Sequence, residues 1–201
     1  SVTVTKAWDD TDNQDGLRSN EIKVQLYANG TAQGEPVELN EANNWTYTWT
    51  ELAKKANKTA INYTVEEINT PSGYTSTVMG DAQTGFTVTN THTPEKTSIS
   101  GTKTWSDADD QDGKRPDSIT VRLLADGKEV SSKVVTADNN WSYTFDNLDK
   151  YANGQLITYT VTEDAVDDYT TSISSYNITN SYTPGKTSVT VTKAWDDNNN
   201  Q

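Results

Sequence analysis

Three polar side chains fall on the apolar faces of segments that are predicted to be β-strands: Lys6, Glu67 and Asn90. Residues two apart along a strand face the same side, and at that spacing these three have hydrophobic or aromatic neighbours. A second set occupies corresponding positions later in the chain: Lys103, Glu163 and Asn180. Burying an unpaired charge costs several kcal/mol, so each lysine and glutamate must be paired or neutral.

A buried salt bridge would satisfy the lysine and the glutamate, but it does not require a carboxamide as well. Amide exchange uses all three groups. Desolvation lowers the pKa of a lysine and raises that of a glutamate, which places a neutral amine beside a protonated acid. The amine could then attack Cγ of the asparagine while the acid relays protons and ammonia leaves. The sequence therefore predicts a Lys-Asn isopeptide bond, and an unreacted buried polar triad is the alternative.

Internal repeats define the organisation of the chain. The segment TKAWDDTDNQDGLR at residues 5–18 recurs as TKTWSDADDQDGKR at residues 102–115, and TKAWDD returns at residues 192–197. A period of this size is that of a domain which can bury its own core. We predict a first repeat at residues 1–95, a second repeat at 96–186, and the truncated first strand of a third repeat at 187–201. The short linkers between repeats predict an extended rod.

The tail contains Lys193 without a glutamate or asparagine of its own. As an alternative to a truncated repeat, the tail of one molecule could replace the first strand of another and react with Asn90 there. Apart from this possibility, we expect a monomer.

Apolar residues alternate with polar ones within each repeat, which is typical of strands. Thr, Val and Tyr dominate these runs and turn residues separate them, so we expect an all-β fold of antiparallel β-sandwiches. The same alternation predicts that Trp45, Tyr47 and Trp49 lie in the core. Helical turns are expected only around residues 51–57 and 146–153.

Composition excludes several classes of function. The 201 residues include no cysteine and one histidine, which excludes disulfides, thiolate catalysis and Cys-based zinc sites. A net charge of −13 opposes binding to nucleic acids and anionic membranes. The sequence has no apolar run long enough to span a membrane. We expect no cofactor.

An acidic loop in each repeat resembles a calcium loop in composition, with its candidate ligands at Asp10, Asp12, Asp107 and Asp109. The spacing does not match an EF-hand, because an additional residue precedes the glycine and no glutamate follows at the required distance. A solvated turn with Asx hydrogen bonds is the preferred interpretation.

The recurring motifs resemble those of the Cna protein B-type domains of Gram-positive surface adhesins and pilins: TK(A/T)W, D-x-D-x-Q-D-G, NNW-(T/S)-Y-T, YTV-x-E and (V/I)TN-(T/S). The resemblance implies immunoglobulin-like sandwiches with an isopeptide bond in each. Its residues would be Lys6 and Asn90 assisted by Glu67, and Lys103 and Asn180 assisted by Glu163.

The same resemblance implies a structural role without enzymatic turnover. The repeats would be stalk modules of an extracellular adhesin on the bacterial cell surface, in a parent protein anchored to the cell wall. Their partners would be neighbouring repeats, with the host ligand bound elsewhere in the parent. The alternative is a module that itself binds a host protein or carbohydrate and whose polar triads stay unreacted.

Overall fold

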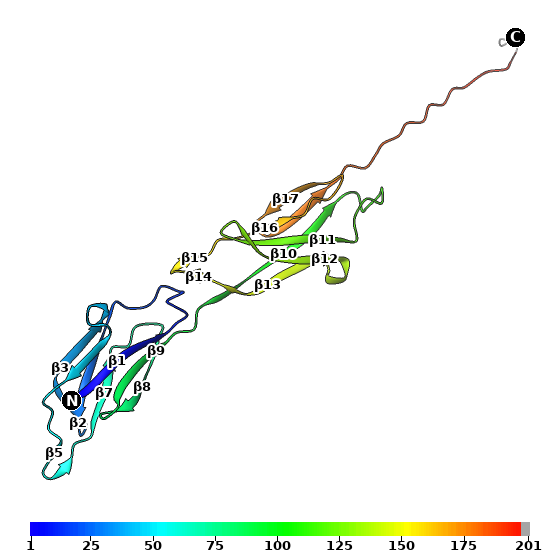
Figure 1. Cartoon of the computed structure of the whole chain (residues 1–201). Helices are drawn as coiled ribbons and strands as arrows, with labels where there is room; N and C mark the ends of the chain where they lie inside the picture. Colours follow the sequence, from blue (N-terminus) through cyan, green and yellow to red (C-terminus); the bar gives the residue numbers. More distant parts are fainter. Residues whose placement is uncertain (198–201) are drawn as a thin grey trace. The chain divides into compact units, whose positions relative to one another are not determined.

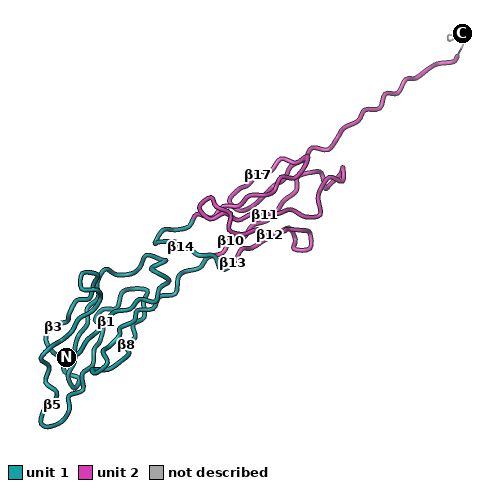
Figure 2. The backbone as a smooth tube through the Cα atoms, viewed as in Figure 1, with its two compact units in different colours: residues 1–97, 147–157 teal, residues 98–146, 158–201 magenta. Residues whose placement is uncertain are grey.

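The computed structural model describes residues 1–197, which form two compact units (Figure 2). The first contains residues 1–97 and 147–157, and the second contains residues 98–146 and the chain from 158 onward. Among the described residues, regular structure consists of strands and two short 3-10 helices, Glu41–Asn43 and Ala137–Asn139. No helix in this part of the chain has the length and apolar character needed to cross a membrane.

Two sheets build the first repeat (Figure 1). One has the strand order β4-β1-β9-β8 and the other β3-β2-β7. The strands are β1 (Val2–Asp9), β2 (Glu21–Ala28), β3 (Thr31–Asn40), β4 (Thr46–Trp49), β7 (Tyr63–Ile68), β8 (Thr75–Asp81) and β9 (Gly85–Thr91). Apolar side chains of both sheets meet in one buried cluster, because alternate residues of each strand face the opposite sheet. The repeat is therefore a β-sandwich, as expected.

The second repeat has the same plan, with sheets β13-β10-β18-β17 and β12-β11-β16. Its strands are β10 (Lys96–Ser106), β11 (Ser118–Ala125), β12 (Lys128–Thr136), β13 (Ser142–Asp149), β16 (Tyr159–Glu163), β17 (Thr170–Ser174) and β18 (Asn177–Ser181). Most pairs are antiparallel, but in each repeat the first and last strands pair in parallel, β1 with β9 and β10 with β18.

The helical turns expected around residues 51–57 and 146–153 are wrong. Short two-stranded hairpins occupy these places: β5 (Lys55–Ala56) with β6 (Thr59–Ala60), and β14 (Tyr151–Ala152) with β15 (Gln155–Leu156). Two consecutive positive φ angles make each turn, 49° and 69° at Asn57 and Lys58, and 50° and 72° at Asn153 and Gly154. Such pairs are typical of the tight turns that join antiparallel strands.

The hairpin β14-β15 belongs to the first compact unit by its contacts. The Gly154 N–H donates to the Gln14 carbonyl at 2.9 Å, and the Gln14 side chain donates to Asp149 Oδ1 at 2.9 Å. Gly16 and Gly154 lie backbone to backbone, since a Cβ on Gly16 would be 2.6 Å from Gly154 Cα. Glycine at both positions permits this approach.

The prediction that Tyr47 lies in the core is also wrong. Its exposed fraction is 41%, whereas Trp45 and Trp49 pack against the core cluster of the first repeat. Tyr47 pairs across the strands with Val4, whose buried side chain already fills that part of the core.

Candidate functional site

Strand pairing brings the predicted lysine and asparagine of each repeat together. In the parallel pair β1-β9, Lys6 lies opposite Val88 and Trp8 lies opposite Asn90. Lys6 and Asn90 are thus diagonal neighbours on the inner face, a spacing that a long side chain can bridge. Lys103 and Asn180 have the same relation in β10-β18.

The glutamate comes from the opposite sheet and completes the site from across the core. Glu67 lies on β7 and Glu163 ends β16, each at the inner face of the smaller sheet. Lys6, Glu67 and Asn90 have exposed fractions of 5%, 7% and 0%. The structure therefore buries the three residues that strand alternation selected.

In the first repeat the glutamate contacts the asparagine. The Asn90 carboxamide donates from Nδ2 to Glu67 Oε1 at 2.8 Å. The Lys6 ammonium donates to the carbonyl of Ala7 at 3.0 Å and to that of Val88 at 3.4 Å. Asn90 Oδ1 has no hydrogen-bond partner among residues 1–197.

In the second repeat the glutamate contacts the lysine instead. Lys103 Nζ lies 3.2 Å from Glu163 Oε1, and both side chains are fully buried. Neither polar atom of the Asn180 carboxamide has a hydrogen-bond partner within the described part of the chain. A buried carboxamide without partners is costly, and that cost favours a rearrangement that uses it.

Burial shifts both lysines toward the neutral amine. Desolvation lowers the pKa of Lys6 to about 8, although the charge of Glu67 opposes this. Desolvation also lowers the pKa of Lys103, against the opposing effect of Glu163. Each Nζ lies over a tryptophan ring, 4.3 Å from the centroid of Trp8 and 3.8 Å from that of Trp105. Each amine is thus held in an apolar site, where the face of the tryptophan ring gives a small stabilisation of the positively charged form.

A hydroxyl group also contacts each glutamate, and sequence reasoning missed it. Ser76 Oγ donates to Glu67 Oε2 at 2.5 Å, and Thr171 Oγ1 donates to Glu163 Oε2 at 3.0 Å. A signal was present in the sequence, because YTSTV at residues 74–78 matches YTTSI at residues 169–173.

The calcium candidates do not come together. Arg18 binds Asp10 through two hydrogen bonds, at 2.6 and 3.0 Å, and the Tyr74 hydroxyl donates to the same carboxylate at 2.8 Å. Burial would raise the pKa of Asp10, but the bonds from Arg18 and Tyr74 outweigh it and hold the pKa at about 2. The Asp12 side chain is fully exposed.

Asp107 repeats this arrangement with Arg115 and the Tyr169 hydroxyl, while Asp109 is exposed. Within residues 1–197, no three His, Cys, Asp or Glu side chains are grouped so that they could hold a metal ion. Asp10 and Asp107 are thus each paired with an arginine of the same repeat.

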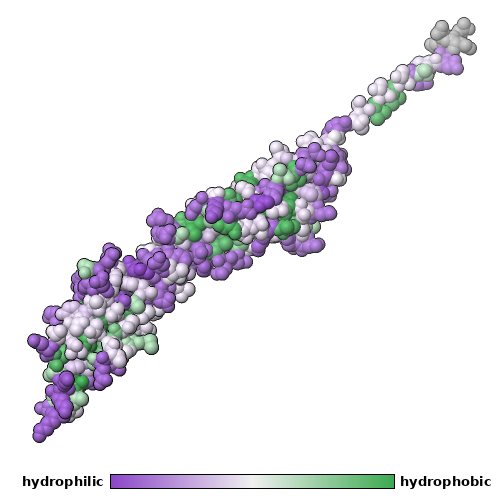
Figure 3. All heavy atoms as spheres, viewed as in Figure 1, coloured by the Kyte–Doolittle hydropathy of each residue, from purple (hydrophilic) through white to green (hydrophobic). Residues whose placement is uncertain are grey.

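The tail places its lysine away from any triad. Lys193 is exposed, and its Nζ donates to the carbonyl of the next residue, Ala194, at 2.8 Å. Figure 3 shows hydrophobic side chains on the surface of the tail, where Val189 and Val191 have exposed fractions of 85% and 87%. Part of the predicted third-repeat segment, residues 198–201, lies outside the described residues.

Comparison with known proteins agrees with this architecture. The sequence profile of the Cna protein B-type domain matches residues 2–91 and 99–181. A collagen adhesin of Staphylococcus aureus is 57% identical over 201 residues, which are 100% of this chain and 17% of that protein.

Among solved structures, two B repeat units (B1B2) of the collagen binding protein of Staphylococcus aureus match with a TM-score of 0.85 and 55% identity. That match covers 100% of this chain and 54% of the crystallised one. The predicted fold class and the predicted family are both confirmed. Because the profile matches both sandwiches over most of their length, the chain belongs to the Cna protein B-type domain family.

Proposed function

We propose that the two repeats are structural stalk modules of a bacterial surface adhesin, each locked by a self-formed Lys-Asn isopeptide bond. The observation that carries the proposal is the convergence of lysine, glutamate and asparagine in the core of both repeats. Because three different strands of two sheets supply them, their meeting twice at corresponding positions supports a shared chemical role.

The reaction would use only groups of the chain. The neutral amine of Lys6 attacks Cγ of Asn90, so that a new C–N bond forms and the bond from Cγ to Nδ2 breaks. Glu67 donates a proton to the departing nitrogen and accepts one from the attacking amine, and ammonia leaves. Lys103, Glu163 and Asn180 would react in the same way. Each domain reacts once and no catalyst is regenerated, so the chain is not an enzyme.

The cross-link would suit a stalk because it joins the first strand to the last. A pull on the chain ends would pass through the bond and bypass the residues between them. Resistance to force and proteases is a kinetic property, and it matters more for an extracellular stalk than equilibrium stability does. We place the modules outside the cell in a wall-anchored parent protein, beside further repeats of the same monomeric chain. The host ligand would bind elsewhere in the parent.

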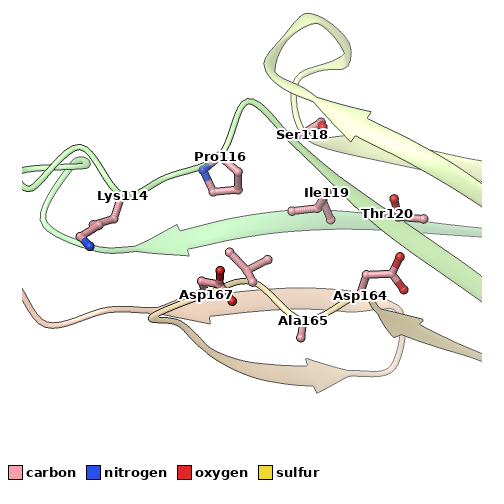
Figure 4. Close-up of a pocket in the computed structure, with 9 residues that line it drawn as sticks. Lys114, Pro116, Ser118, Ile119, Thr120, Asp164, Ala165 and Asp167 are labelled. Atoms are coloured by element: carbon pink, nitrogen blue, oxygen red, sulfur yellow. The ribbon is translucent and has the colours of Figure 1, made fainter.

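The surface offers less support for the ligand-binding alternative. Figure 4 shows a shallow hollow in the second repeat lined by charged and small residues, among them Lys114 and Asp164. Lys114 is paired with Asp168 at 2.8 Å, and Arg122 binds Asp164 at 2.6 and 2.9 Å. No triad residue lines this hollow. Lys114 and Asp164 are thus already paired with charged groups outside the lining of the hollow.

Intact mass under denaturing conditions tests the proposal. The purified chain should lack the mass of two ammonia molecules, and peptide mapping should join Lys6 to Asn90 and Lys103 to Asn180. Glu67→Ala should restore one ammonia and Glu163→Ala the other, each without effect on the other repeat. A full unreacted mass in the folded chain would refute the proposal.

The rate of bond formation adds a pH test. The Lys6-Glu67 pair must hold one proton to react, so the rate should fall above about pH 8, where Lys6 loses its proton. The measurement is the loss of ammonia with time after refolding of chain recovered unfolded from inclusion bodies. A rate that rises steadily to pH 10 would show that only the free amine matters.

A further inference from the structure

We propose that the hydroxyl groups of Ser76 and Thr171 are positioning residues for the isopeptide reaction, each holding one carboxyl oxygen of the glutamate so that the other oxygen faces the reacting groups. This inference rests on the proposed function. It assigns a role to a strand, β8 or β17, that supplies none of the three reacting residues.

Strand pairing delivers the hydroxyl to the site in both repeats. Ser76 lies directly opposite Asn90 in the antiparallel pair β8-β9, and Thr171 lies directly opposite Asn180 in β17-β18. Directly opposed residues have Cβ atoms about 5 Å apart and share a face of the sheet. The hydroxyl is therefore carried beside the asparagine, within reach of a glutamate that crosses from the other sheet.

The two carboxyl oxygens of each glutamate contact different partners. With Oε2 bonded to the hydroxyl at 2.5 Å, Glu67 Oε1 lies 2.8 Å from Asn90 Nδ2. With Oε2 bonded at 3.0 Å, Glu163 Oε1 lies 3.2 Å from Lys103 Nζ. In both repeats Oε2 contacts the hydroxyl and Oε1 contacts a reacting group. A glutamate side chain has three rotatable bonds, and fixing one oxygen restricts the last of them to the reactive orientation.

A hydroxyl can hold the glutamate in both of its protonation states. It donates to the carboxylate, and by rotating its own hydrogen it accepts from the protonated acid. The glutamate of the proposed reaction changes state as it receives a proton from the amine and passes one to the leaving nitrogen. A hydroxyl partner can follow these changes without movement of heavy atoms, whereas an amide N–H only donates and could not accept from a protonated oxygen.

The two repeats supply a natural exchange experiment. Serine and threonine differ by a methyl group and share the hydroxyl, so Ser76→Thr and Thr171→Ser should each react at the wild-type rate. Ser76→Ala and Thr171→Val remove only the hydroxyl function and should slow the altered repeat about tenfold, the scale of one lost orienting hydrogen bond.

The experiment follows ammonia loss at each repeat separately, by refolding unreacted chain and mapping cross-linked peptides with time. The unaltered repeat of the same molecule is the internal clock. Thr75→Val and Thr170→Val are matched controls, because these hydroxyls lie one residue away on the same strands and bond exposed backbone carbonyls of Thr91 and Ser181. Recovery of tryptophan fluorescence reports folding of every variant.

Three outcomes would overturn the inference. Equal rates for Ser76→Ala and wild type would show that the hydroxyl has no role. A Ser76→Thr variant as slow as Ser76→Ala would show that the loss comes from packing. A folded wild-type chain that never loses ammonia would refute the proposed function and this inference together, whereas the first two results leave the proposed function standing.

Discussion

The two repeats hold the same three residues in two different arrangements, one with a hydrogen bond between glutamate and asparagine and one with an ion pair between glutamate and lysine. In the first, Glu67 contacts the carboxamide nitrogen of Asn90, and in the second, Glu163 contacts the amine of Lys103. These are the two contacts that a proton relay needs, one to the attacking nitrogen and one to the leaving nitrogen. The difference teaches that one glutamate position can reach both groups.

The surroundings of the two sites also differ, because side chains of different strands fill the same part of the core in the two repeats. Val4 of β1 corresponds to Gly101 of β10, and Tyr47 corresponds to Tyr143. Without a side chain at Gly101, the Tyr143 ring enters the core and its hydroxyl donates to the Tyr176 carbonyl. Burial raises the pKa of Tyr143 to about 12. In the first repeat Val4 fills this space and Tyr47 remains at the surface.

The largest expected effect comes from removing one of the two proposed cross-links and leaving the other. Asn90→Ala should destabilise the first repeat on the order of 4 to 5 kcal/mol, by the loop-closure estimate for a cross-link that spans most of a domain. Asn180→Ala should do the same to the second repeat. Hydrogen exchange measured by mass spectrometry reports each repeat separately, and an equal effect on both repeats would contradict independent locking.

The pH dependence of the Asn90→Ala variant sharpens this result. Its lysine stays unreacted, and the folded-state pKa of about 8 lies below the ordinary value of 10.5. The unfolded chain therefore binds more protons between these values, and the stability of the first repeat should rise as the pH increases from 8 to 10.5. The cross-linked wild type should lack this rise.

A smaller effect is expected from adding a side chain at Gly101, where the Tyr143 ring occupies the core. A Cβ on Gly101 would lie 1.9 Å from the Tyr176 carbonyl oxygen and 2.5 Å from the Tyr143 hydroxyl. Gly101→Val should therefore destabilise the second repeat by about 1 to 3 kcal/mol through overpacking. Denaturant unfolding checks this against Ser100→Val, an exposed neighbour that should cost little. Adding Tyr143→Ser should recover part of the loss, and no recovery would contradict a volume exchange.

The smallest expected effect is a pH dependence of stability that differs between the two repeats. His92 Nε2 donates to Asp15 Oδ2 at 2.9 Å, and this hydrogen bond raises the pKa of His92. Tyr182 makes the corresponding contact with Asp112 in the second repeat. A histidine with a raised pKa stabilises fully below its ordinary value near 6.5 and loses that contribution as the pH rises through the folded-state value.

The free energy of unfolding of the first repeat should therefore fall between pH 6 and 8, by less than about 1 kcal/mol. That of the second repeat should not fall over this range. Hydrogen exchange at several pH values measures both repeats in one sample. His92→Tyr should abolish the difference, and a pH dependence that survives this change would place its origin elsewhere.

Much of the site could be predicted because strand alternation is local. The side to which Lys6, Glu67 and Asn90 point follows from their neighbours at a spacing of two. The place of Ser76 and Thr171 does not, because it depends on which strand pairs with the last one and in what register. The exposure of Tyr47 was unpredictable for the same reason, since it depends on the volume of Val4 on another strand.

The hairpins at residues 55–60 and 151–156 show another limit. Their sequences lack a clear period. The positive φ angles of Asn57 and Lys58, and of Asn153 and Gly154, distinguish a tight hairpin from a helical turn. Asn tolerates that conformation but does not require it.

Residues 1–10 and 188–197 are identical in sequence. Comparing these two segments therefore separates what the sequence determines from what the tertiary structure determines. The sequence by itself determined the strand period, the repeat organisation and the position of the lysine on the apolar face of its strand. Only the tertiary structure decided that Lys6 is buried at 5% exposure between β4 and β9, while Lys193 is exposed beside its own neighbour. The physical reason is that a strand carries its pattern locally but gains burial, a lowered lysine pKa and a reaction partner only from the strands that pair with it and the sheet that covers it.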